Sequence, residues 1–160
     1  MDAATLRLTQ GPAARVYAMK TLRVTGWIKD TTITSAGNIL SVRAGGMNNS
    51  SLFAGVTGTT LPSSWEGFSN SCLLSSVAIT GIRNGAAWVD SFINSNIAAW
   101  TINSLVLNYP KLANTGTAFG ATADAINRLS IRTATTAGRW AGLRDWSQSV
   151  RMPDLIVRLV

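Results

Sequence analysis

The fold is indicated by residues 39–52, ILSVRAGGMNNSSL, which contain two short patterns in succession. The first pattern, over residues 39–44, is apolar-x-x-apolar-x-apolar. The second, over residues 47–52, is apolar-x-[Asp/Asn]-[Ser/Thr]-x-apolar. Alternation of apolar and polar positions is typical of a strand with one buried face, and an Asn-Ser pair is typical of a turn. The stretch therefore predicts a short strand followed by a polar turn.

Both patterns recur along the chain. The first occurs over residues 19–24, 39–44, 102–107 and 126–131, with a copy over residues 79–84 that ends on a polar residue. The second begins at residues 28, 47, 68 and 92, with a weaker copy at 112, so successive copies start 19, 21, 24 and 20 residues apart. A period of about twenty residues is typical of repeat proteins. Coincidence in a chain rich in Asn, Ser and Thr is a poor explanation for two patterns in phase.

We therefore predict an all-β fold, a right-handed parallel β-helix (β-solenoid) of about six to seven rungs in a single domain. Residues 1–18 are expected to form an N-terminal strand or cap, residues 19–132 the rungs, and residues 133–160 a C-terminal cap with a final strand. A leucine-rich repeat has a similar period but requires a leucine pattern that is lacking. A β-sandwich also uses short strands, but it has no reason to repeat at this period.

Stacked rungs are expected to bring equivalent turn residues together in a ladder. Asn suits such a ladder because it tolerates a left-handed backbone and its amide can hydrogen-bond to the copies on either side. The predicted ladder residues are Asp30, Asn49, Asn70, Asn94 and Asn114. A neighbouring row of hydroxyls is expected at Thr31, Ser50, Ser71, Ser95 and Thr115. Residues 58–64, GTTLPSS, interrupt the pattern and are expected to be a degraded rung or a protruding loop.

Two absences restrict the chemistry. The chain has no His and one Cys, which excludes His general bases, Ser-His-Asp triads, an intrachain disulfide and a Cys-based zinc site. Cys72 lies in a strand-like stretch, so a small buried hydrophobe is favoured over a reactive thiol. We expect no enzyme activity, no cofactor and no metal. No uncharged apolar run is long enough for a membrane helix, and no signal peptide is expected at the N-terminus.

The charge of the chain is strongly positive, with 14 Lys and Arg against 7 Asp and Glu. Most of the basic residues are Arg, and they are scattered rather than clustered. Two interpretations are open: a solvated surface that prevents precipitation, or attraction to an anionic polymer such as nucleic acid or acidic polysaccharide. Nucleic acid is the less expected partner, because no helix-turn-helix, zinc-finger or RRM signature is present.

One group of residues predicts a ligand site. Glu66 and Asp90 each stand two residues before a copy of the second pattern, beside Trp65 and Trp88. In adjacent rungs the two acids would lie close together, and Trp with carboxylate can hold a sugar or, through the acids, a cation. The alternative is that both acids point into solvent on turns and both Trp side chains pack. Catalysis is not expected, because polysaccharide-cleaving β-helices use clustered acids and four of the five ladder residues are Asn.

The repeats resemble those of large bacterial cell-surface and adhesin-like proteins with parallel β-helix folds. The resemblance covers about residues 19–132 and is carried by residues 39–50, 53–56, 90–97 and 119–126. It implies an extracellular or cell-surface location and a structural role, and it provides no catalytic residues.

The two ends of the chain also predict strands, at residues 6–8 and 155–160, and neither end shows a capping helix. Residues 139–146 are expected to cap the stack or to form a loop with two aromatic anchors. Uncapped ends expose sheet edges that invite further strands. The expected function is therefore a non-enzymatic structural or adhesive module that stacks on copies of itself or is cut from a longer solenoid. The alternative is a carbohydrate-binding or carbohydrate-active β-helix.

Overall fold

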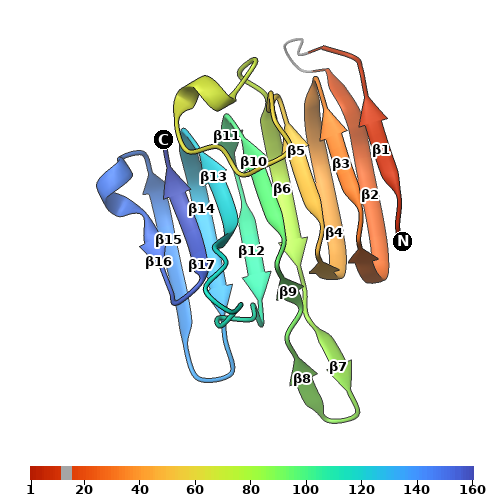
Figure 1. The fold of residues 1–160 in the computed structure, drawn as a ribbon, viewed down its shortest axis with the longest axis vertical. Coiled ribbons are helices and arrows are strands. Elements are labelled where there is room, and N and C mark those ends of the chain that lie inside the picture. The colour runs from red at the N-terminus through yellow and green to blue at the C-terminus, as the bar shows by residue number, and fades with distance from the viewer. Residues whose placement is uncertain (12–15) are drawn as a thin grey trace.

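The computed structural model describes residues 1–11 and 16–160, and its folded elements are almost all β-strands (Figure 1). Residues 12–15, which belong to the predicted N-terminal cap, lie outside the described residues. The strands form two large sheets, named here sheet A and sheet B, and one small hairpin. The protein is therefore all-β, as the sequence predicts.

Sheet A has the longer strands, and its main strands pair in parallel. In order across the sheet they are β2 (Tyr17–Lys29), β4 (Asn38–Asn48), β6 (Leu73–Ile79), β12 (Leu105–Asn108) and β14 (Ala125–Arg132). The short strands β9 (Phe92–Ile93) and β11 (Thr101–Ile102) join it, and β15 (Ala137–Leu143) pairs antiparallel with β14 at the far edge.

Sheet B faces sheet A and is also built mainly from parallel strands. Its parallel strands are β1 (Thr5–Leu8), β3 (Thr32–Ser35), β5 (Ser51–Ala54), β10 (Asn96–Ala99), β13 (Phe119–Ala123) and β17 (Leu155–Leu159). The two-residue strand β16 (Val150–Arg151) closes the far edge in the antiparallel sense.

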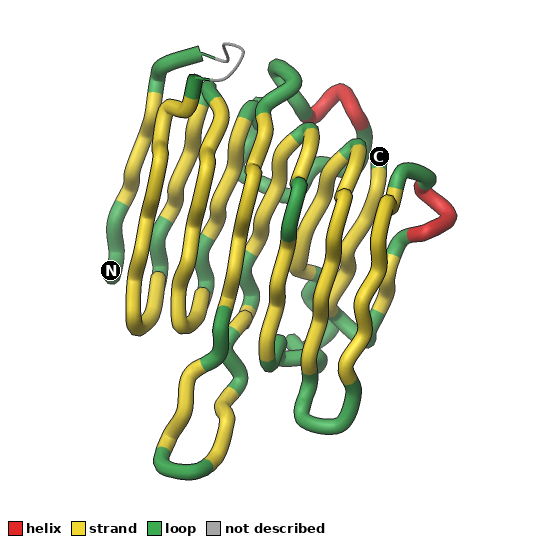
Figure 2. Tube along the Cα trace, turned by 180° about the vertical axis from the view of Figure 1, so that it is seen from behind, coloured by secondary structure: helices red, strands yellow, loops and turns green. Residues whose placement is uncertain are grey.

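The chain alternates between the two sheets. Strand β1 lies in sheet B, β2 in sheet A, β3 in sheet B and β4 in sheet A. The alternation continues to β14, except that two passages through sheet A are divided, one into β6 and β9 and the other into β11 and β12, and that β7 and β8 lie outside both sheets. Each circuit therefore adds one strand to each sheet, beside the strand of the previous circuit. Figures 1 and 2 show the two layers from opposite sides, with the N-terminus at one end and the last strands at the other.

The first sequence pattern is in register across sheet A. Its three apolar positions form three rows: Met19, Ile39, Leu74, Ile102 and Ile126; Leu22, Val42, Val77, Leu105 and Leu129; and Val24, Ala44, Ile79, Leu107 and Ile131. The predicted copy over residues 79–84 is wrong. The third copy is residues 74–79, and Ile79 is its last residue, because the chain leaves the sheet there for an inserted hairpin.

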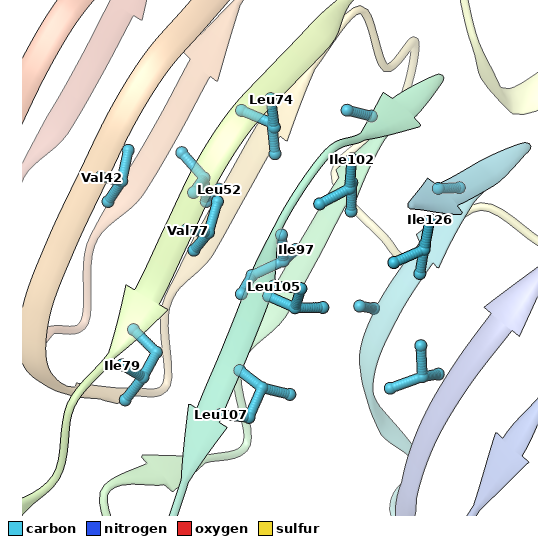
Figure 3. Close-up of a cluster of buried hydrophobic side chains, with 14 of the residues drawn as sticks. Val42, Leu52, Leu74, Val77, Ile79, Ile97, Ile102, Leu105, Leu107 and Ile126 are labelled. Carbon is cyan, nitrogen blue, oxygen red and sulfur yellow. The ribbon is translucent and has the colours of Figure 1, made fainter. Parts of the chain in front are cut away.

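The core lies between the sheets and consists of these rows together with apolar residues of sheet B. Figure 3 shows Val77 and Leu105 of sheet A and Leu52 and Ile97 of sheet B in one apolar cluster. All four side chains are fully buried. Burial of a Leu or Ile side chain contributes roughly 1.5–3 kcal/mol, so the stacked rows are the main source of stability.

The segment over residues 55–72 covers the outer face of sheet B. It contains a single 3-10 turn, η1 (Trp65–Gly67), and its Phe68 packs with Phe53, Ala98 and Trp100 in a second apolar cluster. The Phe68 and Trp100 rings meet edge to face, with 5.8 Å between centroids. Residues 58–64 therefore form a loop rather than a degraded rung. Most of the loop is exposed, and it is held on sheet B by Leu61, which packs against the second cluster, and by Pro62, whose carbonyl accepts from Arg158.

A second insertion follows β6. Ala44 pairs with Ile79, and Met47 pairs with Phe92. Two residues separate Ala44 from Met47, whereas twelve separate Ile79 from Phe92, so the later circuit contains ten additional residues at this point. The additional residues form an antiparallel hairpin of β7 (Ile82–Asn84) and β8 (Ala87–Val89), which projects beyond the sheets in Figure 1.

The C-terminal end is closed by antiparallel strands. Residues 139–143, predicted as a cap or a loop, lie in β15, whose Trp140 packs against the core beside Leu129. The chain then passes through a 3-10 turn, η2 (Trp146–Gln148), into β16 and β17. Within residues 1–11 and 16–160, no helix has the length and apolar character needed to cross a bilayer.

Candidate functional site

The structure does not bring the two predicted Trp-acid pairs together. Trp65 and Glu66 lie in η1, before β6, whereas Trp88 and Asp90 lie in and after β8, beyond the other end of β6. A strand of this length separates them by roughly 20 Å. Figure 1 shows the loop before β6 at the top of the molecule and the β7–β8 hairpin at the bottom. The sequence prediction assumed that every rung has the same length. The two insertions, one on either side of β6, make this circuit longer than the others.

Trp88 is engaged in a stack of its own. Its ring lies against Tyr109 with 4.7 Å between centroids and 13° between planes, and the Arg83 guanidinium lies 4.4 Å from the ring centroid. Arg132 approaches Tyr109 from 5.7 Å. Gly81, at φ +93°, permits this stack because a Cβ atom there would press on both rings. These contacts occupy ring surface that a sugar would need, and they anchor the hairpin to the sheets.

Four of the five predicted ladder residues are hydrogen-bonded in series. The Asn49 Nδ2 donates to Asp30 Oδ1 over 2.6 Å, Asn94 Nδ2 donates to Asn49 Oδ1 over 3.1 Å, and Asn114 Nδ2 donates to Asn94 Oδ1 over 3.1 Å. Asp30, Asn49 and Asn94 have φ between +41° and +47°, the conformation that Asn and Asp tolerate best. The ladder follows the turns from sheet A to sheet B.

Asn70 is not part of this ladder. It lies at the end of the loop over sheet B, where the chain enters sheet A, and its Oδ1 accepts from Cys72 Sγ at 2.8 Å. Its backbone oxygen also lies beside Gly55. The Phe68 copy of the second pattern thus matches the turns in composition but occupies a different corner, and Ser71 is absent from the hydroxyl row for the same reason.

The hydroxyl row binds successive turns together beside the ladder. Ser50 Oγ accepts from the backbone N–H of Thr31, and Ser95 Oγ accepts from that of Ser50, each over 3.1 Å. The Ser50 and Ser95 hydroxyls also donate to the carbonyl two residues earlier, over 2.7 Å. All three residues are buried, and the Ser50 and Ser95 hydroxyls provide the acceptors that the buried N–H groups of Thr31 and Ser50 need. Thr115 is exposed and bonds locally to Asn114.

A charge placed in the ladder tests its contribution. Asn49→Asp replaces the amide that donates to Asp30 with a second carboxylate, so a hydrogen bond is lost and like charges face each other. We expect the free energy of unfolding in urea to fall by about 1 to 2 kcal/mol. The double variant Asp30→Asn, Asn49→Asp keeps the net charge and is expected to recover most of the loss. Equal stability of the single variant and the wild type would contradict the role of the ladder.

Cys72 is fully buried and hydrogen-bonds to Asn70 and to the carbonyl of Ala36. Burial raises the pKa of its thiol to about 11, so the thiolate is scarce at neutral pH. This environment is that of a structural thiol rather than a nucleophile. Among residues 1–11 and 16–160, no three Cys, Asp or Glu side chains are placed to hold a metal ion together.

The most distinctive exposed surface is the end of the stack where β1 and β2 lie, named here the N-terminal end face. Its inward-pointing side chains, Leu6, Met19, Leu22 and Val24, are only half-buried. At the opposite end, Leu155, Val157 and Leu159 of β17 are 1%, 1% and 4% exposed. The apolar rows are therefore covered at one end and open at the other.

The sheet edge at this face is also open. In sheet A, one side of β2 pairs with β4. On the other side, the hydrogen bonds from described residues reach only the end of β2: the Met1 amino group donates to the Trp27 carbonyl, and the Ala3 N–H donates to the Lys29 carbonyl. Within residues 1–11 and 16–160, no strand pairs with residues 17–26 along this edge. The sequence predicted open ends but not which end; the signal available was the alternation in residues 19–24, which marks Met19, Leu22 and Val24 as inward-pointing.

Comparison with known proteins gives no relative from which a site could be transferred. No family model, no curated protein and no solved structure matches the chain.

Proposed function

We propose that this protein is a non-enzymatic structural or adhesive module, a right-handed parallel β-helix of a bacterial surface or extracellular assembly. The alternation of parallel strands between two sheets supports a helical coil, since each circuit is one rung. The apolar core, the Asn ladder and the hydroxyl row all join neighbouring circuits. All seven carboxylates are among the described residues and none lies in a strand, which gives no support to the acidic groove of a carbohydrate-cleaving β-helix.

The half-buried N-terminal end face is the observation that carries the assembly part of the proposal. Two copies that meet at this face would bury Leu6, Met19, Leu22 and Val24 of each, and residues 17–26 of the two β2 strands would pair. A two-fold axis makes such an interface self-complementary. Half-buried apolar rows beside a strand edge that no other described strand covers are the kind of surface that natural sheets cover or protect.

The oligomeric state and one edge variant test this assembly. We expect sedimentation equilibrium to give a mass that rises from one copy to two between low and high micromolar concentration. Leu22→Lys places an inward charge on the edge strand, a device that natural sheets use against association, so the variant should fold and remain a monomer. The control Leu40→Lys changes an exposed residue of β4 and should dimerise like the wild type. A wild-type monomer at high concentration would contradict the proposal.

A further inference from the structure

The outward face of sheet A carries arginines that form no ion pair within residues 1–11 and 16–160. Arg23 of β2 lies opposite Arg43 of β4 in the strand register, and both are exposed. At the far edge of the same face, β14 presents Arg128 and Arg132. Arg139 of β15 lies opposite Ser130, the residue midway between these two arginines. These five residues are named here the arginine face.

The sequence of every strand in sheet A lacks Asp and Glu. Among the described residues, the ion pair that is present joins Lys29 and Asp30, at the turn and not on the arginine face. Like charges directly opposite on neighbouring strands destabilise a sheet, so the Arg23 and Arg43 pair carries an uncompensated cost. An anionic ligand on this face would remove that cost.

Between the two groups of arginines the outward side chains are mostly small, and the surface over β12 is hollowed. They include Ser76 and Ala78 of β6, Ser104 just before β12, and Val106 and Asn108 within β12. A groove of about 850 Å³ lies over β12, β14 and β15, and its lining includes Arg128, Arg132 and Arg139 together with Ser104, Ser130 and Asn108. The groove therefore combines cations with hydroxyl and amide groups.

We propose that the arginine face binds a linear acidic polysaccharide. Arginine pairs with carboxylate or sulfate through two parallel hydrogen bonds, and the Ser and Asn side chains of the groove match sugar hydroxyls. Single-stranded nucleic acid is less well matched, because it requires aromatic rings on which bases stack. Trp140 is the aromatic residue in the groove lining, and it packs against the core. The proposal does not depend on self-association, since the arginine face is separate from the N-terminal end face except at Arg23.

Calorimetric titration at low salt tests the site with four probes: polygalacturonate, heparin, uncharged dextran and a single-stranded DNA oligonucleotide. We expect binding to one or both acidic polysaccharides, no binding to dextran, and an affinity that falls steeply with salt. The double variant Arg128→Gln, Arg132→Gln should weaken binding at least about tenfold, which corresponds to about 1.4 kcal/mol. The matched control Arg7→Gln, Arg151→Gln removes the same charge from exposed positions outside the arginine face and should change the affinity less than about twofold.

Three results would overturn the proposal: no binding to either acidic polysaccharide, equal weakening in the two double variants, or tighter binding of the DNA. Equal weakening would mean that net charge alone attracts the polymer. Urea unfolding of each variant verifies that it folds. Repeating the titration with Leu22→Lys separates this proposal from the assembly, because a monomer with the arginine face intact should bind as the wild type does.

Discussion

Replacing Gly120 with alanine is expected to lower the free energy of unfolding by about 3 to 5 kcal/mol. Gly120 lies in β13 at φ +140°, a backbone conformation that residues with a side chain rarely adopt. A Cβ atom at this position would also overlap the carbonyl oxygen of Ile156 in β17. The backbone must shift to relieve the overlap. The shift would disturb β17, whose Leu155, Val157 and Leu159 cover the C-terminal end of the core between the sheets. Urea unfolding followed by circular dichroism measures the loss.

Gly26→Ala provides the matched control. Gly26 is also a strand glycine, but it has no positive φ and nothing lies within 4 Å of a Cβ atom added there. Its replacement should change the free energy of unfolding by less than about 1 kcal/mol. If the two variants lose equal stability, the close contact with Ile156 is not the cause, and the described pairing of β13 with β17 would be in doubt.

Phe92→Ala is expected to cost about 3 to 5 kcal/mol, because it leaves a cavity in the main core. Phe92 is fully buried at the corner between the sheets, and its ring meets that of Phe119 with 5.7 Å between centroids. It belongs to β9, which pairs with the end of β4, so its loss also loosens the turn that carries Asn94 and Ser95. The urea midpoint should fall without a change in the slope of the transition.

Phe68→Ala distinguishes the main core from the second cluster on sheet B. Phe68 is nearly buried, but it fixes a loop and lies outside the rows between the sheets. We expect a smaller global loss, together with faster proteolysis within residues 55–72, since this segment can open locally. If Phe68→Ala destabilises the protein as much as Phe92→Ala does, the loop is an integral part of the folding unit rather than a cover.

The sequence predicted the stacking but not the insertions. Residues 19–24, 39–44, 102–107 and 126–131 align as expected because every circuit buries the same three side chains. The copy at 79–84 and the ladder position of Asn70 were wrong because a loop and a hairpin interrupt the third circuit on both sides of β6. Nothing local distinguishes Asn70 from Asn49, since each stands two residues after an apolar residue and directly before Ser. Their positions differ only through the path of the chain.

The predicted ligand site failed for the same reason, whereas part of the arginine face could be found from the sequence. Arg23 and Arg43 occupy the same outward position in two copies of the first pattern. Arg139 could not be placed, because β15 pairs antiparallel and follows no repeat. The covered and open ends were equally unpredictable, since coverage depends on how the last strands fold back.

The hairpin of β7 and β8 leaves the sheets at one corner and returns to the same corner, and its tip residue Gly85 has no neighbour within 4 Å of an added Cβ atom. The inserted residues therefore leave the apolar rows of sheet A in register on both sides of the hairpin. For protein engineering, this corner offers a grafting point where a foreign peptide could be displayed on a rigid support. A longer array would then present several such peptides at a spacing fixed by the distance between neighbouring strands.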